Sequence, residues 1–247
     1  MNTKSCVQKL FIGYILTLFL LVSTTTFAAY KPPTNPSRPK SPTGSNSTRT
    51  NGCIGTAQTT LTALTPLSHF GQTVSSQPTF VWFVPDTEPH EMEFSLHEYG
   101  VSGKGKLIKK IQLQSSSGIM KLSLSKEKIS LSTGQKYLWQ IALLCNKNNP
   151  SEDLLAKAVV EVVPKPPRLA DALSRTKEIV KQADIYAEAG LWYDALSLAL
   201  QEPQYKAFSL NLLTQLSNLE AEPNNTKDVQ QHASQIKQII AVERQRR

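Results

Sequence analysis

The stretch that decides the fold is Thr79-Phe-Val-Trp-Phe-Val84, in which aromatic and β-branched residues follow one another between two prolines. Residues of these types favour an extended strand. Because side chains alternate between the two faces of a strand, Phe80, Trp82 and Val84 share one face. Their size and apolar character predict that this face is buried in a hydrophobic core.

Strands of the same texture are predicted on both sides of this stretch. Their ranges are 59–64, 91–99, 107–114, 119–125, 136–145 and 154–163. Two of them carry one apolar face each, formed by Met92, Phe94 and Leu96 and by Tyr137, Trp139, Ile141, Leu143 and Cys145. Seven short strands separated by turn residues predict an all-β, Ig-like or fibronectin-like sandwich over residues 53–164.

The hydrophobic period changes from two to the helical one after Pro164-Lys-Pro-Pro167. Apolar residues from Leu169 to Ala187 recur at spacings of three and four, which predicts one helix of about five turns ended by Gly190. Two shorter helices are predicted over 191–201 and 205–219. Together they predict a small α-helical domain over residues 165–221, followed by a polar, basic, loosely helical C-terminal tail over 222–247.

The first residues predict export. Two lysines precede an apolar run from Leu10 to Val22, and small residues follow up to Ala28. This order is typical of a signal peptide over residues 1–28, cleaved after Ala28. The alternative is an uncleaved anchor, but the apolar run is shorter than the roughly 20 residues that cross a membrane. We therefore expect a periplasmic or secreted protein with no stable membrane insertion after cleavage.

Residues 29–52 contain five prolines among Ser, Thr, Asn and Gly, and almost no apolar residue. Such a composition cannot bury enough surface to offset the entropy of ordering the chain. A disordered Pro/Ser/Thr-rich linker is therefore predicted between the signal peptide and the β domain.

The charge pattern gives no sign of a nucleic-acid partner. The formal net charge is +8, but six of the positive charges fall in residues 1–52, and the remaining chain is nearly neutral. One local basic cluster consists of Lys104, Lys106, Lys109 and Lys110. It has no interleaved aromatic residues for base stacking. Two interpretations remain, lysines that protect the edge of a sheet and a surface that meets an acidic polymer or lipid.

Cleavage of the signal peptide removes Cys6 and leaves Cys53 and Cys145 as the thiols of the mature chain. An even pair outside the cytoplasm predicts one disulfide between them. The alternative is two buried free cysteines.

Several stretches resemble known families. The segment Tyr186-Ala-Glu-Ala-Gly-Leu-Trp-Tyr-Asp-Ala-Leu-Ser-Leu-Ala-Leu200 resembles the turn of a tetratricopeptide helix pair, without a second copy at a fixed period. Four stretches together are similar to the cyanobacterial exported family called domain of unknown function 928: Leu61-Thr-Ala-Leu-Thr-Pro66, Pro78-Thr-Phe-Val-Trp-Phe-Val-Pro85, Gly134-Gln-Lys-Tyr-Leu-Trp139 and the segment from Tyr186 to Leu196. This resemblance implies a cyanobacterial, extracytoplasmic protein with a β domain before a helical one, and no established activity.

No catalytic, metal-binding or cofactor-binding residues are predicted. His90 and His97 come nearest to a metal cluster, with Glu91, Glu93 and Glu98, but alternation places His97 on an expected solvated face. The sequence contains no Gly-x-Ser-x-Gly elbow and no phosphate-binding loop.

The most suggestive polar residue is Asp194, which follows Trp192 and Tyr193. These three residues are the candidate partner-binding site, in a groove that a helical pair could present. A helix-capping role for Asp194 is the alternative.

Three functions follow as hypotheses. The first is a non-catalytic envelope binding or adaptor module with a protein partner. The second is a carbohydrate-binding module for cell-wall or extracellular polysaccharide, which would require Trp82, Trp139 or Trp192 to be exposed. The third is an enzyme of a kind that the sequence does not reveal.

Overall fold

The computed structural model describes residues 29–34, 44–46, 59–85, 88–101, 103–146 and 150–246. The predicted signal peptide and Cys53 lie outside the described residues, so both the cleavage and the disulfide remain predictions. Within the described ranges, no helix is both long enough and apolar enough to cross a membrane.

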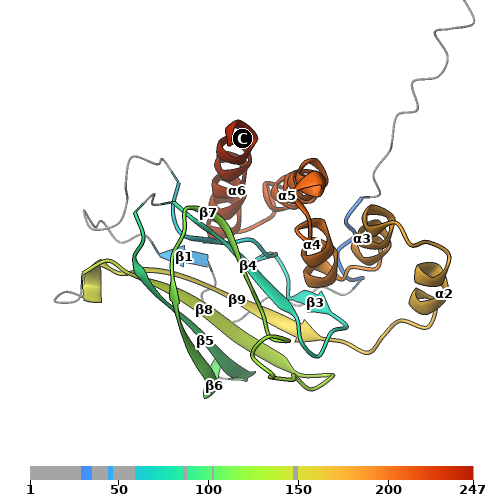
Figure 1. The fold of residues 1–247 in the computed structure, drawn as a ribbon, viewed down its shortest axis with the longest axis horizontal. Helices are drawn as coiled ribbons and strands as arrows, with labels where there is room; N and C mark the ends of the chain where they lie inside the picture. Colours follow the sequence, from blue (N-terminus) through green and yellow to red (C-terminus); the bar gives the residue numbers. More distant parts are fainter. Residues whose placement is uncertain are drawn as a thin grey trace, which may run out of the picture.

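Two sheets form the β part of the molecule (Figure 1). The larger has the order β1-β9-β8-β5-β6, with β3 also pairing with β9, and the smaller has the order β2-β4-β7. The strands of the larger sheet are β1 (Gly44–Asn46), β3 (Gly71–Thr73), β5 (Glu91–Gly100), β6 (Gly103–Gln114), β8 (Lys136–Leu144) and β9 (Leu154–Val162). Those of the smaller sheet are β2 (Thr62–Ala63), β4 (Thr79–Val84) and β7 (Gly118–Ser123).

The predicted apolar faces of the strands meet between the two sheets. Phe80 and Trp82 of β4 are fully buried, as are Phe94 of β5 and Trp139 of β8. The ring centroid of Phe80 lies 5.2 Å from that of Phe94 and 5.2 Å from that of Trp139. The predicted apolar faces therefore lie in the core, but β4 is buried on both faces, since Val81 and Phe83 are also buried.

The architecture is β-rich with a C-terminal helical region, as the sequence predicted, but it is not clearly an Ig-like sandwich. Strand β3 pairs with β9 in parallel, whereas neighbouring strands of an Ig-like sandwich pair antiparallel. The smaller sheet has one extended pair, β4 with β7, because β2 contains only two residues. Helices pack beside this small sheet and complete the burial that further strands would otherwise provide (Figure 1).

The predicted long helix is two helices, α2 (Leu169–Ser174) and α3 (Ile179–Glu188). Between them, the hydroxyl of Thr176 accepts a hydrogen bond from the backbone N–H of Glu178 at 3.1 Å. Such a local turn competes with the helical bonds of the same residues. The apolar spacing continues across the break, which is why the sequence pattern does not reveal it.

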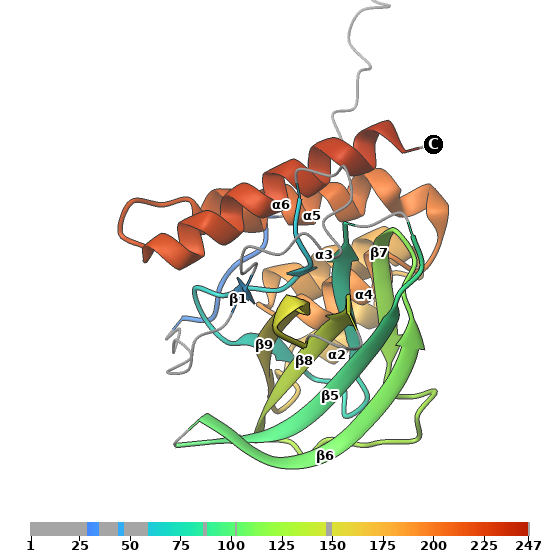
Figure 2. The same ribbon diagram turned by 90° about the vertical axis from the view of Figure 1, so that its left-hand side faces the viewer.

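The remaining helices are α4 (Trp192–Ala199), α5 (Lys206–Glu220) and α6 (Lys227–Gln245), with short 3₁₀ turns at Pro150–Glu152 and Pro203–Tyr205. Figure 2 shows α5 and α6 lying side by side along one side of the molecule. The prediction of a loosely held tail is wrong, because Ile236, Ile239 and Ile240 of α6 are buried. The end of α6 is fixed by Arg246, whose guanidinium donates to Ser117 O at 2.7 Å and Ser117 Oγ at 2.8 Å.

Residues 29–34 form an N-terminal strap, so the prediction of a disordered linker is wrong for them. Tyr30 is buried, and its hydroxyl lies 2.7 Å from His69 Nε2 while its ring meets that of Trp192 edge-on. The N–H of Lys31 donates to Ala187 O at 3.1 Å. The strap passes so close to Gly190 that a Cβ there would lie 3.1 Å from Lys31 O, and the φ of Gly190 is +79°. The buried ring of Tyr30 and the backbone contacts to α3 and Gly190 hold this polar segment against the helices.

Strand β1 is the second part of the predicted linker that is ordered. It pairs antiparallel with β9, with Ser45 opposite Ala156. Backbone hydrogen bonds to a strand edge do not require apolar side chains, so composition gives no signal of this pairing.

One continuous hydrophobic cluster joins the β part to the helices. It includes Trp82 and Trp139 from the sheets, Trp192 from α4, Leu212 from α5 and Ile236 from α6. The β part and the helical part therefore share a core instead of packing as the two separate units that the sequence suggested.

Candidate functional site

Two of the three candidate partner-binding residues are part of this core. Trp192 is fully buried, and its Nε1 donates to Leu64 O at 2.9 Å. Tyr193 is 3% exposed, and its hydroxyl accepts a hydrogen bond from Trp139 Nε1 at 2.8 Å. Trp82 and Trp139 are also fully buried, which removes the exposed tryptophans that the polysaccharide hypothesis required. Tyr193 and the half-buried Asp194 both line a surface pocket, named the Asp194 pocket after its polar residue.

The Asp194 pocket has a volume of about 180 Å³ and lies where the β3–β4 segment meets α3 and α4. Helices α3 and α4 form a hairpin around Gly190, which brings side chains of both helices to one side. The polar residues that line the pocket are Thr73, Ser75, Gln77, Thr79, Gln182, Tyr186, Asp194 and Ser197. Pro78, Tyr193 and Leu198 complete the wall.

Asp194 is held by the strand segment opposite its own helix. Its Oδ2 accepts a hydrogen bond from the N–H of Val74 at 3.1 Å, and it is also bonded by the side chain of Thr73. Burial raises the pKa of Asp194 to about 6, although these bonds act in the opposite direction. The group is therefore mainly ionised at pH 7, and it takes up a proton as the pH falls through about 6.

Several other polar groups of the pocket are not used by the fold. The side chains of Gln77, Thr79, Tyr186 and Ser197 make no hydrogen bond to any other residue that the structure describes. Burial and the charge of Asp194 raise the pKa of Tyr186, so its phenol keeps its proton. The pocket thus presents the carboxylate of Asp194 together with two hydroxyls, a phenol and an amide that can form additional hydrogen bonds.

The family model for the Domain of Unknown Function (DUF928) matches residues 44–236. The chain belongs to the DUF928 family. The matched range contains all the described strands, helices α2 to α5 and the first half of α6, and hence the whole lining of the Asp194 pocket. Neither a curated protein nor a solved structure matches the chain.

A second polar cluster of this DUF928 protein lies in its interior, at the meeting of α5, α6 and β2. Glu220 is fully buried, and its Oε2 lies 2.5 Å from Nδ1 of the buried His232. Glu220 Oε1 accepts the N–H groups of Leu67 and Ser68, and His232 Nε2 lies 2.9 Å from Ala63 O. These contacts tie two helices to the smaller sheet, which is a structural role.

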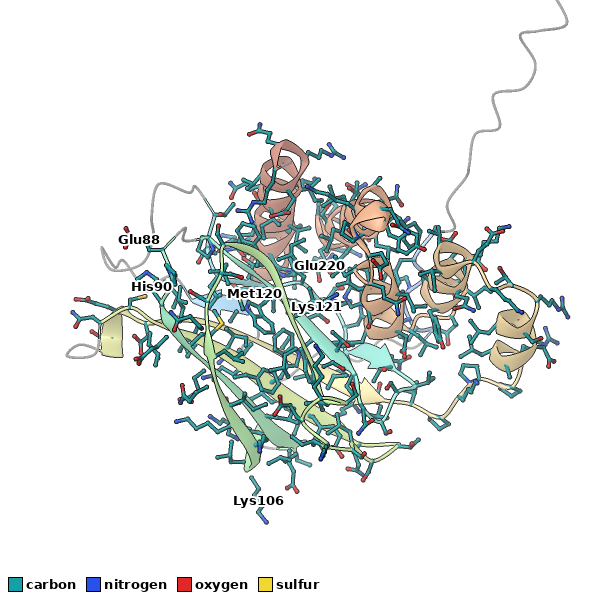
Figure 3. The ribbon with its side chains drawn as sticks, viewed as in Figure 1. Glu88, His90, Lys106, Met120, Lys121 and Glu220 are labelled. Carbon is teal, nitrogen blue, oxygen red and sulfur yellow. The ribbon has the colours of Figure 1, made fainter. Side chains whose placement is uncertain are left out.

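The lysine cluster of the DUF928 protein lies on β6, the edge strand of the larger sheet. Most of this strand is exposed, and Lys106 points away from the body of the molecule (Figure 3). Lys110 pairs with Glu93 of the neighbouring strand at 2.6 Å. This position fits the interpretation that the lysines protect a sheet edge from pairing with other chains.

His97 lies in a different environment from the one that alternation predicts. It is 6% exposed instead of solvated, at an irregularity in the pairing of β5 with β6 that follows Leu96. Burial and the nearby charge of Lys104 lower its pKa. Among the described residues of the DUF928 chain, no group of three His, Cys, Asp or Glu side chains could hold a metal ion.

The sequence indicated only part of the candidate site. Asp194 was singled out, and Tyr186 opens the stretch that resembles a tetratricopeptide pair, but the turn residues Ser75 and Gln77 and the first residue of β4, Thr79, were not recognised. Their signal was the Ser-Ser-Gln-Pro run before β4, which reads as an ordinary turn. Only the packing of α4 on β3 and β4 gives these residues a role in the pocket.

Proposed function

We propose that this DUF928 protein is a non-catalytic binding or adaptor module of the cell envelope that holds its ligand in the Asp194 pocket. The observation that carries the proposal is the group of polar side chains that converge there from three segments without a described partner. Buried polar groups are normally paired with protein or ordered water, whereas these half-buried groups remain accessible for hydrogen bonds to water or to a ligand. Groups that remain available around a half-buried carboxylate are suited to a ligand.

The location is part of the same proposal. We propose that residues 1–28 are a cleaved signal peptide, that the mature chain acts in the periplasm or outside the cell, and that the source is a cyanobacterium. The order of charged, apolar and small residues supports the cleavage. We also propose that α3 and α4 are a tetratricopeptide-like pair whose exposed side forms one wall of the pocket. The ligand then belongs to an envelope partner, a protein or a polysaccharide.

We further propose the disulfide between Cys53 and Cys145. Cys145 directly follows β8, and its half-buried side chain packs against the core. Intact mass after alkylation without reduction should show no labelled cysteine in the mature secreted chain. Two labelled thiols would contradict the bridge, and alkylation after reduction provides the control.

Binding should require the ionised form of Asp194. The experiment uses an envelope extract that has been separated into a protein fraction and a polysaccharide fraction. We expect one of these two fractions to raise the melting temperature of the mature chain by several degrees at pH 7.5. The shift should shrink as the pH falls through about 6, the pKa of Asp194. Asp194→Asn should lose the shift at every pH, since an amide carries no charge and donates where the carboxylate accepts.

The ligand-free protein should respond to pH in the opposite direction. Because the folded pKa of Asp194 is raised from 3.8 to about 6, this group destabilises the folded state as pH rises across that interval.

For the binding experiment, Asp171→Asn, on the exposed surface of α2, is the matched control and should leave the ligand-induced shift in melting temperature unchanged. Equal shifts in wild type and Asp194→Asn would overturn the proposed site.

A further inference from the structure

The lining of the Asp194 pocket selects for groups that both donate and accept hydrogen bonds. Hydroxyls of Thr79 and Ser197, the phenol of Tyr186 and the amide of Gln77 each have donor and acceptor capacity. None of them is used by another described residue. A ligand that satisfies them all must offer acceptors to the hydroxyl protons and donors to the oxygens.

The charge of the pocket excludes two other ligand classes. Among the described lining residues none is basic, and the carboxylate of Asp194 would repel an anion. An ammonium group would satisfy Asp194, but it has no acceptor for the hydroxyl protons of Thr79 and Ser197. A neutral molecule with several hydroxyls can donate to Asp194 and still accept from the other groups.

The size and the apolar part of the wall limit the ligand to a single ring. The volume of about 180 Å³ is well below the roughly 300–1,000 Å³ of pockets that enclose drug-sized ligands. Pro78, Leu198 and the half-buried ring of Tyr186 supply C–H and aromatic surface beside the polar groups. A sugar ring has this combination, because its hydroxyls point outward around a face of C–H groups.

We infer that the Asp194 pocket binds one neutral glycosyl unit, such as a terminal or branch residue of an envelope polysaccharide. This inference rests on the function proposed above and names the chemistry of its ligand. Asp194 accepts from a sugar hydroxyl, the hydroxyl and amide side chains pair with the other hydroxyls, and Tyr186 packs beside the ring. The site is independent of the buried tryptophans.

The test is calorimetric titration of the mature chain with four small probes at pH 7.5. Glucose and galactose are neutral, glucuronic acid is anionic, and choline is permanently cationic. We expect at least one neutral sugar to bind, and glucuronic acid and choline to bind at least about tenfold more weakly or not at all. Asp194→Asn and Gln77→Ala should each weaken sugar binding by about tenfold or more, because each loses a hydrogen bond to the ligand.

The control is again Asp171→Asn, which should bind as wild type does, and the melting temperature of each variant shows whether it is folded. Tighter binding of choline or glucuronic acid than of both neutral sugars would overturn the inference. A second outcome would also overturn the inference: neither sugar binds, but an extract fraction still raises the melting temperature and this shift is lost in Asp194→Asn. In that case the proposed function stands. If neither sugar nor extract depends on Asp194, the proposed function fails together with the inference.

Discussion

Replacing His232 with Ala is expected to destabilise the folded protein by about 3–5 kcal/mol, because the buried carboxylate of Glu220 loses its charged partner. The contact between Glu220 Oε2 and His232 Nδ1 is 2.5 Å long, and both side chains are almost completely buried. The substitution also removes the hydrogen bond of His232 to Ala63 O. Urea denaturation at pH 6 should show the loss as a lower midpoint.

The effect should depend on pH in a defined direction. Burial lowers the pKa of His232, but the charge of Glu220 and the hydrogen bonds to Glu220 and Ala63 outweigh it, so the folded pKa is raised. Stabilisation by the protonated ring is therefore complete below the ordinary value of 6.5 and is lost as pH rises through the folded pKa. The difference between wild type and His232→Ala should shrink accordingly at alkaline pH.

The neighbouring residue on α6 gives a matched control. Gln231 is exposed on the same helical turn, so Gln231→Ala should change the stability by less than about 0.5 kcal/mol. A loss from His232→Ala as small as that of the control would mean that the buried pair contributes nothing to the fold.

Replacing Trp192 with Ala is expected to destabilise the folded protein by about 3–5 kcal/mol, because it opens a cavity in the shared core. The indole is fully buried, donates to Leu64 O and packs against the ring of Tyr30. A thermal melt followed by near-ultraviolet circular dichroism should show the loss. Any failure of this variant to bind a partner would then report unfolding and not a lost contact surface.

A smaller change separates packing from hydrogen bonding at the same position. Trp192→Phe keeps an aromatic ring and removes the indole donor, so Leu64 O loses its partner at a cost of about 1–3 kcal/mol. A fully stable Trp192→Ala that has lost ligand binding would restore Trp192 as a binding residue and contradict its place in the core.

The sequence predicted the helices and strands whose own apolar residues pack them into the core. Strand β4 and helix α5 each carry an apolar face that is visible in a short window, and both lie close to the predicted ranges. Strands β1 and β3 have three residues each and exist because β9 offers a free edge. Such a strand is determined by its partner, so its own residues give no periodic signal.

The candidate site was harder to predict for a related reason. Asp194 is polar between apolar neighbours, yet Trp192 and Tyr193 are buried in the core while Asp194 is half-buried. Neighbouring residues on a helix point about 100° apart, so Trp192 and Asp194 lie on different sides of α4, and Tyr193 between them contacts both the core and the pocket. The pairing of Glu220 with His232 was missed because most residues of α6 are polar, which hides the apolar face that packs the helix against the core.

The N-terminal strap also has a consequence for the order of assembly. The N–H of Tyr30 donates to the side chain of Gln215, 185 residues further along the chain. Contacts between such distant residues form late, since the loop between them must close first. During synthesis Tyr30 and its partner His69 are made long before α4 and α5 exist, so the strap must wait for nearly the whole chain to be made before its helical partners are available.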